Sequence, residues 1–223
     1  MNSIQIRKCR KSDKDEIINV CFHCGYYGGD ASPYFSDKNL FGLLFCSYYP
    51  KYEPENGFVA VTQENNKRKI IGYALSSLDT KKYEKIYKQK IKWKLILRLY
   101  IYTSWRYHSD FHIVRRFLKN SKPETGETIN EIAYWEEYPA HLHIDVLNQY
   151  QRKGIGTRLI KSLEDHLISK GVKGVCLGTS EKNYKSIPFY KKHNYRLLGK
   201  SQGLGFWPED KEIQSLYFGK RLC

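Results

Sequence analysis

A glycine-bearing turn between an apolar run and a helix-like stretch is the feature that most constrains this chain. The turn spans residues 151–156 (Gln-Arg-Lys-Gly-Ile-Gly), after the run 141–147 and before the stretch 157–163. Backbone N–H groups at the start of a helix are unpaired, and the helix dipole favours negative charge there. Gly154 and Gly156 lack a Cβ, so a phosphate can come close to the main chain. The pattern predicts a strand, a phosphate-binding turn and a helix.

The turn fits neither of two other common phosphate-binding patterns. Residues 157–159 are Thr-Arg-Leu, so the third glycine of a dinucleotide-binding Gly-x-Gly-x-x-Gly is missing. The Gly-Lys-Ser/Thr of a P-loop is missing as well. Arg152 and Lys153 add positive charge at the turn. The turn therefore needs a second motif before it can be assigned to a ligand.

That second motif lies downstream. Residues 174–179 read as a buried strand, and residues 183–192 (Asn-Tyr-Lys-Ser-Ile-Pro-Phe-Tyr-Lys-Lys) follow. Residues 146–156 resemble the acetyl-CoA pyrophosphate loop of the GNAT superfamily of N-acetyltransferases, Gln/Arg-x-x-Gly-x-Gly/Ala after the central strand. Residues 183–192 resemble the family's Asn-x-x-Ala-x-x-Phe-Tyr helix, with Ser186 in the small-residue place. The resemblance predicts the GNAT fold, an α/β fold with a mixed central sheet flanked by helices.

Two further segments narrow the resemblance. Residues 138–145 (Tyr-Pro-Ala-His-Leu-His-Ile-Asp) and 29–34 (Gly-Asp-Ala-Ser-Pro-Tyr) resemble the GNAT branch related to the acetyltransferase-like domain of O-GlcNAc hydrolases and its freestanding bacterial relatives. The resemblance covers nearly the whole chain, including a long insertion before the central strand. In the animal hydrolases that domain is regarded as a pseudo-acetyltransferase with a degraded cofactor site. Here residues 151–156 are intact, which favours acetyl-CoA binding.

We predict a single GNAT domain over residues 1–223, with an insertion at about 80–137. Hydrophobic periodicity and turn residues place the other elements. Strands are predicted at 3–9, 58–62, 70–75, 141–147, 174–179, 195–198 and 215–218. Helices are predicted from 12–13 through Cys21, over 40–48 ending before Pro50, and from Thr157 to Lys170-Gly171. The resemblance implies a further helix over 183–192.

The insertion is strongly basic. The chain has a net charge of +15, and residues 81–120 hold twelve Lys or Arg against two acids, which is +10 of that charge. Apolar residues from Tyr83 to Leu99 recur every four positions, as on a helix face, but residues 91–101 also alternate, as in a strand. We favour helix because the run is long and begins with good helix formers. A second helix is predicted over 112–118.

Several functions of the basic insertion stay open. It could be a lid over the acceptor site, or a solvated helix that covers the core. Aromatic residues interleave with Lys and Arg between Trp93 and Tyr107, as in nucleic-acid-binding segments. An anionic membrane surface is a further alternative. Of these, nucleic acid and membrane are the less favoured.

The resemblance implies direct transfer. A neutral amine attacks the thioester carbonyl of acetyl-CoA, and a proton reaches the departing thiolate. The motif places Tyr190 as the acid, since a phenol is protonated at neutral pH. The base candidates are Asp145 and His143, on one face of the central strand. Glu136, Glu137 and a water chain are the alternatives.

The resemblance also implies the cofactor contacts. The backbone of the central strand's end holds the pantetheine arm, the turn and the first helical residues hold the pyrophosphate, and the second motif contacts the cofactor arm or caps its helix. The strand end is Val146 and Leu147. The turn and first helical residues are Gln151, Arg152, Lys153, Gly154, Ile155, Gly156 and Thr157. The second motif contributes Asn183 and Ser186. Three positions depart from the family pattern: Asn148 replaces a common proline, Arg152 a frequent glycine, and Asn194 a glycine at a helix end. Asn tolerates the left-handed conformation, so that last turn is expected to survive.

Other classes of protein are disfavoured. No apolar run approaches a membrane span of about 20 residues, and residues 1–16 lack the apolar core of a signal peptide. The six cysteines are scattered, and Cys21 and Cys24 have the spacing of half a zinc site with no second pair to complete it. We therefore predict a cytoplasmic protein without a metal.

The predicted function is an acetyl-CoA-dependent N-acetyltransferase that moves an acetyl group to a primary amine. The alternative is a non-catalytic acyl-CoA-binding or protein-interaction module, a pseudo-acetyltransferase on the same fold. Acetyl-CoA is expected as co-substrate. The acceptor, the acyl-chain preference and the oligomeric state, including a homodimer, stay open.

Overall fold

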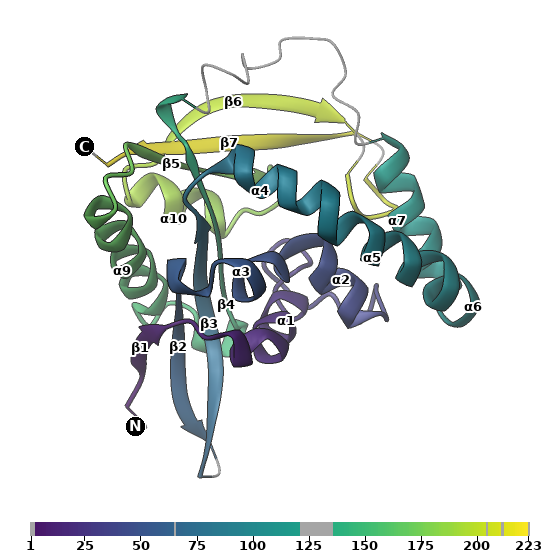
Figure 1. Ribbon diagram of the computed structural model, residues 1–223, viewed down its shortest axis with the longest axis horizontal. Helices are drawn as coiled ribbons and strands as arrows, with labels where there is room; N and C mark the ends of the chain where they lie inside the picture. The colour runs from purple at the N-terminus through teal and green to yellow at the C-terminus, as the bar shows by residue number, and fades with distance from the viewer. Residues whose placement is uncertain (1–2, 65, 121–135, 204, 211, 223) are drawn as a thin grey trace.

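A seven-stranded mixed sheet forms the centre of the protein (Figure 1). The computed structural model describes residues 3–64, 66–120, 136–203, 205–210 and 212–222. The strand order is β1-β2-β3-β4-β5-β7-β6, and among the described pairs only β4 and β5 run parallel. The strands are β1 (Gln5–Lys8), β2 (Gly57–Glu64), β3 (Lys67–Ser77), β4 (Ala140–Val146), β5 (Gly174–Ser180), β6 (Arg196–Gly203) and β7 (Ile213–Arg221). The predicted α/β fold with a mixed sheet is confirmed.

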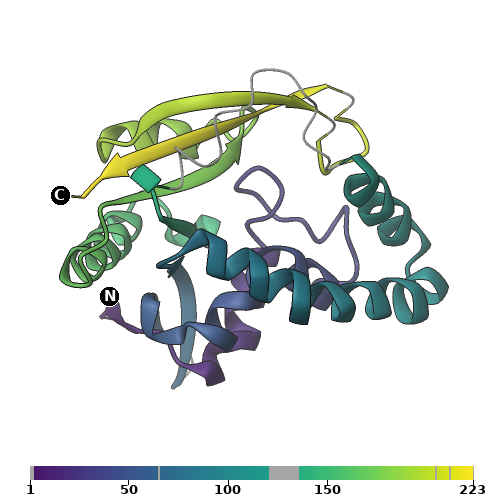
Figure 2. The ribbon, with the colours of Figure 1, turned by 45° about the horizontal axis from the view of Figure 1, so that its top comes forward.

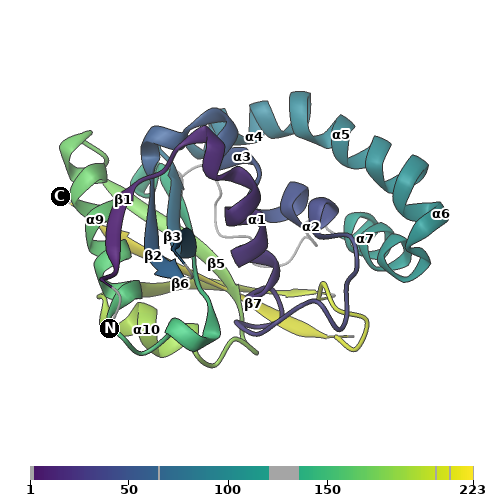
Figure 3. The same ribbon diagram turned by 90° about the horizontal axis from the view of Figure 1, so that it is seen from below.

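Helices cover both faces of the β1–β4 half of the sheet (Figures 1 and 3). The helix α1 contacts β3 on one side and also contacts α2, whereas α9 packs on β2, β3 and β4 from the other. The apolar residues predicted for one face of α9, such as Leu159 and Leu163, are fully buried. These helices are α1 (Lys14–Phe22), α2 (Lys38–Phe45), α3 (Tyr48–Tyr52) and α9 (Ile155–Ser169). The helix α10 (Ser186–Lys192) lies beside β5 and β7 instead.

The two halves of the sheet diverge between β4 and β5. β4 pairs with β3 along six positions, from His141 to Val146, but it meets β5 only at Ala140 and His141. Figures 1 and 2 show β5, β7 and β6 running across the direction of β2, β3 and β4. From Leu142 onward, the edge of β4 that faces β5 therefore has no strand partner among the described residues.

The insertion between β3 and β4 is helical, as predicted, and the strand alternative is wrong. A continuous helix runs through α4 (Thr80–Ile86), a π turn (Tyr87–Ile91), α5 (Lys92–Leu97), a second π turn (Arg98–Thr103) and α6 (Ser104–Arg106), and α7 (His108–Asn120) follows. Its inner stripe, defined as Ile91, Leu95, Leu99 and Thr103, is buried. A four-residue spacing drifts by about 40° per step on a regular α-helix, and the wider π turns reduce that drift. Residues 121–135 of the predicted insertion lie outside the described residues.

A buried carboxylate attaches the insertion to the rest of the protein. Asp37, whose side chain is 1% exposed, accepts hydrogen bonds from the Arg98 guanidinium (2.7–3.0 Å) and from the Thr103 hydroxyl (2.8 Å). The same carboxylate caps α2 by accepting from the Leu40 N–H at 3.0 Å. Asp37 therefore joins α2 to the middle of the long inserted helix.

We expect Asp37→Ala to lower the free energy of unfolding by about 3–5 kcal/mol, because it leaves the Arg98 charge without its buried partner and removes a helix cap. Denaturant unfolding of the full chain measures the loss. Asp79→Ala is the matched control, since Asp79 is exposed and only caps α4 through the Lys82 N–H at 3.1 Å. That variant should lose about 1 kcal/mol. Equal losses in the two variants would contradict the anchoring role of Asp37.

Several predicted helix boundaries differ from the structure. The helix predicted over 183–192 begins at Ser186, and the one predicted over 112–118 runs from His108 to Asn120. The helix predicted over 40–48 is split, because α2 ends at Phe45 and a separate short helix, α3, runs from Tyr48 to Tyr52. Pro50 lies inside α3 rather than after a helix. It occupies the first turn, where its missing N–H has no intrahelical partner to lose.

Candidate functional site

The turn between β4 and α9 opens the start of α9 to solvent. Gly154 has φ +75° and precedes the first helical residue, Ile155. A Cβ built on Gly154 would meet nothing within 4 Å. Arg152 also adopts a left-handed conformation, with φ 59°, which explains why glycine is frequent at this place in the family. The first N–H groups of α9 therefore face open space, as an anion site requires.

The two sequence motifs meet at Gly156. A Cβ on Gly156 would lie 3.2–3.3 Å from the ring of Phe189 on α10, closer than side chains normally pack. The next residue, Thr157, has its hydroxyl 3.1 Å from His193 Nε2 just after α10. Gly156 thus allows the first turn of α9 to lie against α10. The motifs around residues 151–156 and 183–192 form one site.

The end of β4 offers backbone groups to a ligand on its open edge. Antiparallel pairing alternates, so neighbouring residues direct their N–H and C=O to opposite edges of the strand. The Leu147 N–H bonds to the Ile71 carbonyl at 2.9 Å, on the β3 side. Ile144 and Val146 consequently face the gap toward β5. The Leu147 N–H is therefore occupied, and the open edge offers the backbone of Ile144 and the N–H of Val146 instead.

Gln151 holds the turn in place. Its side-chain amide donates to the Val146 carbonyl at 2.8 Å. The Tyr150 N–H bonds to the Leu147 carbonyl at 2.8 Å and closes the short 3₁₀ turn before it. Arg152 and Lys153 remain exposed beside the start of α9. The turn therefore combines a fixed backbone with two exposed positive charges.

Asn183 and Ser186 have different surroundings. The Ser186 hydroxyl lies 3.3 Å from that of Thr179 and donates to the Asn183 carbonyl at 3.1 Å, so it fixes the start of α10. Asn183 precedes α10, and its side chain caps no helix. Its Oδ1 is buried and has no hydrogen-bond partner among the described residues. The buried Asn183 oxygen remains available to a donor from a ligand.

Tyr190 projects from α10 into the core and is 7% exposed. Its ring lies 6.0 Å from that of Tyr195 and 5.9 Å from that of Phe218. Burial, and then the negative charge of Asp145, raise the pKa of Tyr190 above its ordinary value. Its hydroxyl accepts or donates no hydrogen bond within the described ranges. The phenol is therefore protonated at neutral pH and uncommitted, as a proton donor should be.

Asp145 has the properties of a base that works near neutrality. Its side chain is 21% exposed, and burial raises its pKa to about 7, while a hydrogen bond from Tyr73 opposes that rise. Tyr73 donates to Asp145 Oδ2 at 2.5 Å, and the Tyr73 oxygen lies 3.0 Å from His143 Nδ1. Burial lowers the pKa of His143 to about 4, so this ring is neutral at pH 7. The Tyr73 hydroxyl has one proton to donate, and it donates that proton to Asp145. The Tyr73 oxygen therefore accepts a hydrogen bond from His143 Nδ1–H.

The other base candidates lie elsewhere. Glu137 pairs with Arg221 on the surface at 2.9 Å, and Glu136 is exposed. His141 shares a strand face with His143 and Asp145 and is not among the candidates. It lies under the insertion, with its ring 4.4 Å from that of Tyr83, and burial lowers its pKa to about 4. Of the predicted bases, the structure brings only His143 and Asp145 together with one hydroxyl.

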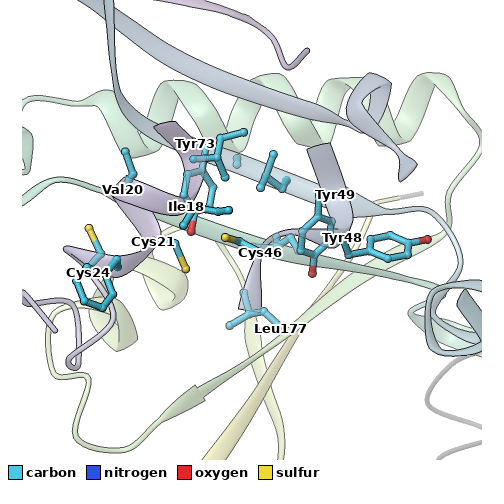
Figure 4. Close-up of a cluster of buried hydrophobic side chains, with 14 of the residues drawn as sticks. Ile18, Val20, Cys21, Cys24, Cys46, Tyr48, Tyr49, Tyr73 and Leu177 are labelled. Atoms are coloured by element: carbon cyan, nitrogen blue, oxygen red, sulfur yellow. The ribbon is translucent and has the colours of Figure 1, made fainter. Parts of the chain in front are cut away.

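Tyr73 is the residue that the sequence pattern did not reveal. It lies directly opposite Asp145 in the β3–β4 register and is fully buried. Its signal in the sequence is a tyrosine inside an otherwise apolar strand, residues 70–75. Figure 4 shows Tyr73 near Cys21 and Cys46, and Cys21, Cys24 and Cys46 are free thiols.

One group in the described part of the chain could hold a metal ion. The ligand atoms of Cys21, His143 and Asp145 lie within 4.8 Å of one another. His143 Nδ1 and Asp145 Oδ2 already share hydrogen bonds with Tyr73, so these two atoms have a partner without an ion. The expectation that the protein uses no metal stays a prediction.

Solved structures share this fold over their whole length. SsHAT has a TM-score of 0.70 and 24% identity, covering 99% of each chain. The yncA protein of Salmonella typhimurium, solved with its cofactor acetyl-CoA, has a TM-score of 0.53 and 15% identity over 100% of this chain and 95% of that one. An N-acetyltransferase from Staphylococcus aureus has a TM-score of 0.53 and 15% identity over 99% of each chain. These similarities concern the fold.

Sequence comparison identifies the family. "Probable N-acetyltransferase 14" of Xenopus tropicalis is 36% identical over 63 residues, which is 28% of this chain and 31% of that relative. The chain thus matches less than a third of the length of this curated relative. The profile of the acetyltransferase (GNAT) family matches residues 26–195, well over half of the chain. The protein therefore belongs to the acetyltransferase (GNAT) family, as the paired motifs at residues 151–156 and 183–192 predict.

Proposed function

We propose that the protein is an N-acetyltransferase that transfers the acetyl group of acetyl-CoA directly to a primary amine. The observation that carries the proposal is the unpaired edge of β4, which connects the open start of α9 with the strand that holds Asp145. A cofactor arm can lie along such an edge as an extra strand would. The intact turn and the retained Tyr190 favour an enzyme over a non-catalytic module.

Acetyl-CoA binding would use three parts of the chain. The pyrophosphate would accept hydrogen bonds from the first N–H groups of α9, with Arg152 and Lys153 beside it. The pantetheine arm would bond to the backbone of Ile144 and to the N–H of Val146, since the Val146 carbonyl already accepts from Gln151. The buried Oδ1 of Asn183 would accept from an N–H of the arm. Each contact satisfies a group that the described residues leave open.

The transfer itself needs three proton movements. The acceptor ammonium loses a proton to the Asp145 carboxylate, and the neutral amine attacks the thioester carbonyl carbon. The new C–N bond forms as the C–S bond breaks, the departing thiolate takes the phenol proton of Tyr190, and the amide nitrogen gives its second proton back to the Tyr190 phenolate. Tyr73 keeps part of the Asp145 population ionised at neutral pH, because its hydrogen bond lowers the Asp145 pKa. His143 holds Tyr73 in position for that bond.

The acceptor is a primary amine of unidentified structure. The net charge of +15 disfavours a polycationic acceptor, because like charges repel. No helix in the described ranges combines the length and the apolar character that a membrane span needs. The cytoplasmic location, the homodimer and the acyl-chain preference stay predictions.

A screen of amines tests the activity. Purified protein is incubated with acetyl-CoA and single amines, and the release of free CoA thiol is followed together with the mass of each acetylated product. We expect amine-dependent thiol release for at least one class of primary amine. Tight acetyl-CoA binding without transfer to any amine would support the alternative, a non-catalytic acyl-CoA-binding module.

The pH dependence of kcat/KM should identify the base. Asp145 must be ionised to accept a proton, so kcat/KM should rise as the pH increases through about 7, the pKa to which burial raises this carboxyl. Asp145→Asn should remove this rise and lower kcat/KM at pH 8 by about 10²-fold or more. Tyr73→Phe should move the rise to higher pH, because the hydrogen bond that lowers the Asp145 pKa is gone. Initial rates measured from pH 5.5 to 9 give all three profiles.

Glu137→Gln is the matched control for this experiment. It removes a carboxylate that pairs with Arg221 on the surface, and the profile of the wild type should persist. If the rise of kcat/KM with pH is lost in Glu137→Gln and kept in Asp145→Asn, the base is Glu137 and not Asp145.

A further inference from the structure

The inserted helix carries a second apolar stripe on its outer side. This outer stripe, defined as Trp93, Leu97, Ile101 and Trp105, is 70%, 59%, 69% and 87% exposed. Nothing among the described residues covers it. Large apolar side chains exposed in a continuous row are uncommon on a soluble surface and mark a site of interaction.

The outer stripe is not needed to hold the helix in place. The inner stripe has the same four-residue spacing, is offset by two positions and is buried. Two positions correspond to about 200° around a helix, so the stripes lie on opposite sides. Figures 1 and 3 show the inserted helix along the edge of the molecule, with α2 on one side of it. The helix is apolar toward the protein and apolar again away from it.

Positive charge lies along the first half of the outer stripe. Lys88, Lys90, Lys92 and Lys94 precede or flank its first half, and Lys92 and Lys94 are exposed. Residues 81–120 as a whole carry +10. A second copy of this chain would bring the same charge to the interface, which disfavours self-association through the stripe. A fitting partner has a negatively charged surface with an apolar layer beneath it.

The composition of the stripe separates a lipid surface from a nucleic acid. Single-stranded nucleic acids bind by stacking bases on aromatic rings. The middle of the stripe is Leu97 and Ile101, which cannot stack. Aliphatic side chains enter the acyl region of a bilayer, tryptophans prefer the headgroup level, and lysines reach lipid phosphates. Trp93 and Trp105 stand at the two ends of the stripe.

We propose that the outer stripe docks the protein on an anionic membrane surface, with the inserted helix lying in the plane of the headgroups. The Asp37–Arg98 pair and the buried inner stripe fix this helix before any lipid arrives. Docking therefore does not have to order the helix, which is a large cost for peptides that fold on a membrane. Apolar burial and lysine–phosphate attraction both contribute to the binding.

Vesicle sedimentation tests the proposal with the full chain. The protein should sediment with vesicles of phosphatidylcholine and phosphatidylserine, should not sediment with phosphatidylcholine alone, and should lose affinity as salt is raised. Ile101→Asp should weaken vesicle binding by about tenfold or more. Ile168→Asp is the matched control, because Ile168 is 46% exposed on α9, and this variant should bind as the wild type does.

Three results would overturn the proposal. The first is a wild type that does not bind anionic vesicles. The second is equal vesicle binding by the Ile101→Asp and Ile168→Asp variants. The third is a single-stranded RNA that binds the wild type, loses affinity in Ile101→Asp and displaces the vesicles, which would make the stripe a nucleic-acid site. Both variants should keep the acetyl-CoA affinity and unfolding curve of the wild type, so the result is independent of the proposed enzymatic function.

Discussion

Tyr190→Phe is expected to lower kcat by about 10²–10⁴-fold while leaving the acetyl-CoA affinity almost unchanged. The variant keeps the buried ring but removes the proton that the departing thiolate needs, and general acids contribute about this factor. Release of CoA thiol at saturating acetyl-CoA measures kcat. The pKa of Tyr190, raised by burial and by the charge of Asp145, keeps the phenol protonated over the whole neutral range.

Tyr195→Phe is the matched control. Tyr195 is also buried, its ring lies 6.0 Å from that of Tyr190, and its hydroxyl donates to Glu164 at 3.0 Å. Loss of that hydroxyl should cost about 1 kcal/mol of stability and should leave kcat near the wild-type value. Equal turnover by the two variants would rule out Tyr190 as the acid.

Gly154→Val is expected to weaken acetyl-CoA binding by about 100-fold or more. The branched side chain would occupy the open space before α9, and φ +75° is a conformation that valine strongly disfavours. Calorimetric titration with acetyl-CoA measures the affinity. A loss of about 2.7 kcal/mol corresponds to the 100-fold change.

Gly171→Val separates blocked binding from backbone strain. Gly171 has φ +70° at the other end of α9, and a Cβ there also meets nothing within 4 Å. This variant should suffer similar strain and should bind acetyl-CoA as the wild type does. If both variants lose the same affinity, the effect comes from damage to α9 and the turn is not the pyrophosphate site.

The sequence predicted the parts of the site whose chemistry is local. A turn with two glycines, the start of a helix and a second motif at the right separation are all visible in short stretches of the chain. The left-handed conformations of Gly154 and Asn194 agree with the residue types found there. The 3.6-residue period of its apolar residues also predicts which face of α9 is buried.

The rest of the site depends on contacts across the sheet. Tyr73 meets Asp145 only because the β3–β4 register places them opposite each other, and a β-bulge between Ala60 and Val61 shifts the neighbouring β2–β3 register. The β3–β4 register also decides that the Leu147 N–H bonds to the Ile71 carbonyl. Short-range patterns do not fix a register of this kind.

The insertion was ambiguous for a physical reason. Two stripes with a four-residue spacing and an offset of two positions together give apolar residues at every second position. This is the pattern of a strand, although each stripe belongs to a helix. The ambiguity therefore reflects the exposed outer stripe, which a helix that only covers the core would not have.

Amide hydrogen exchange of the full chain, with and without saturating acetyl-CoA, tests the account most directly because it needs no acceptor. Among the described residues, nothing pairs with the N–H groups at the start of α9 or with those of Ile144 and Val146, so they should exchange rapidly. Bound acetyl-CoA should slow exchange at residues 144–146 and 154–157 and leave α7 unchanged. Unchanged exchange at these residues under saturating acetyl-CoA would contradict the assignment of β4 and α9 as the cofactor site.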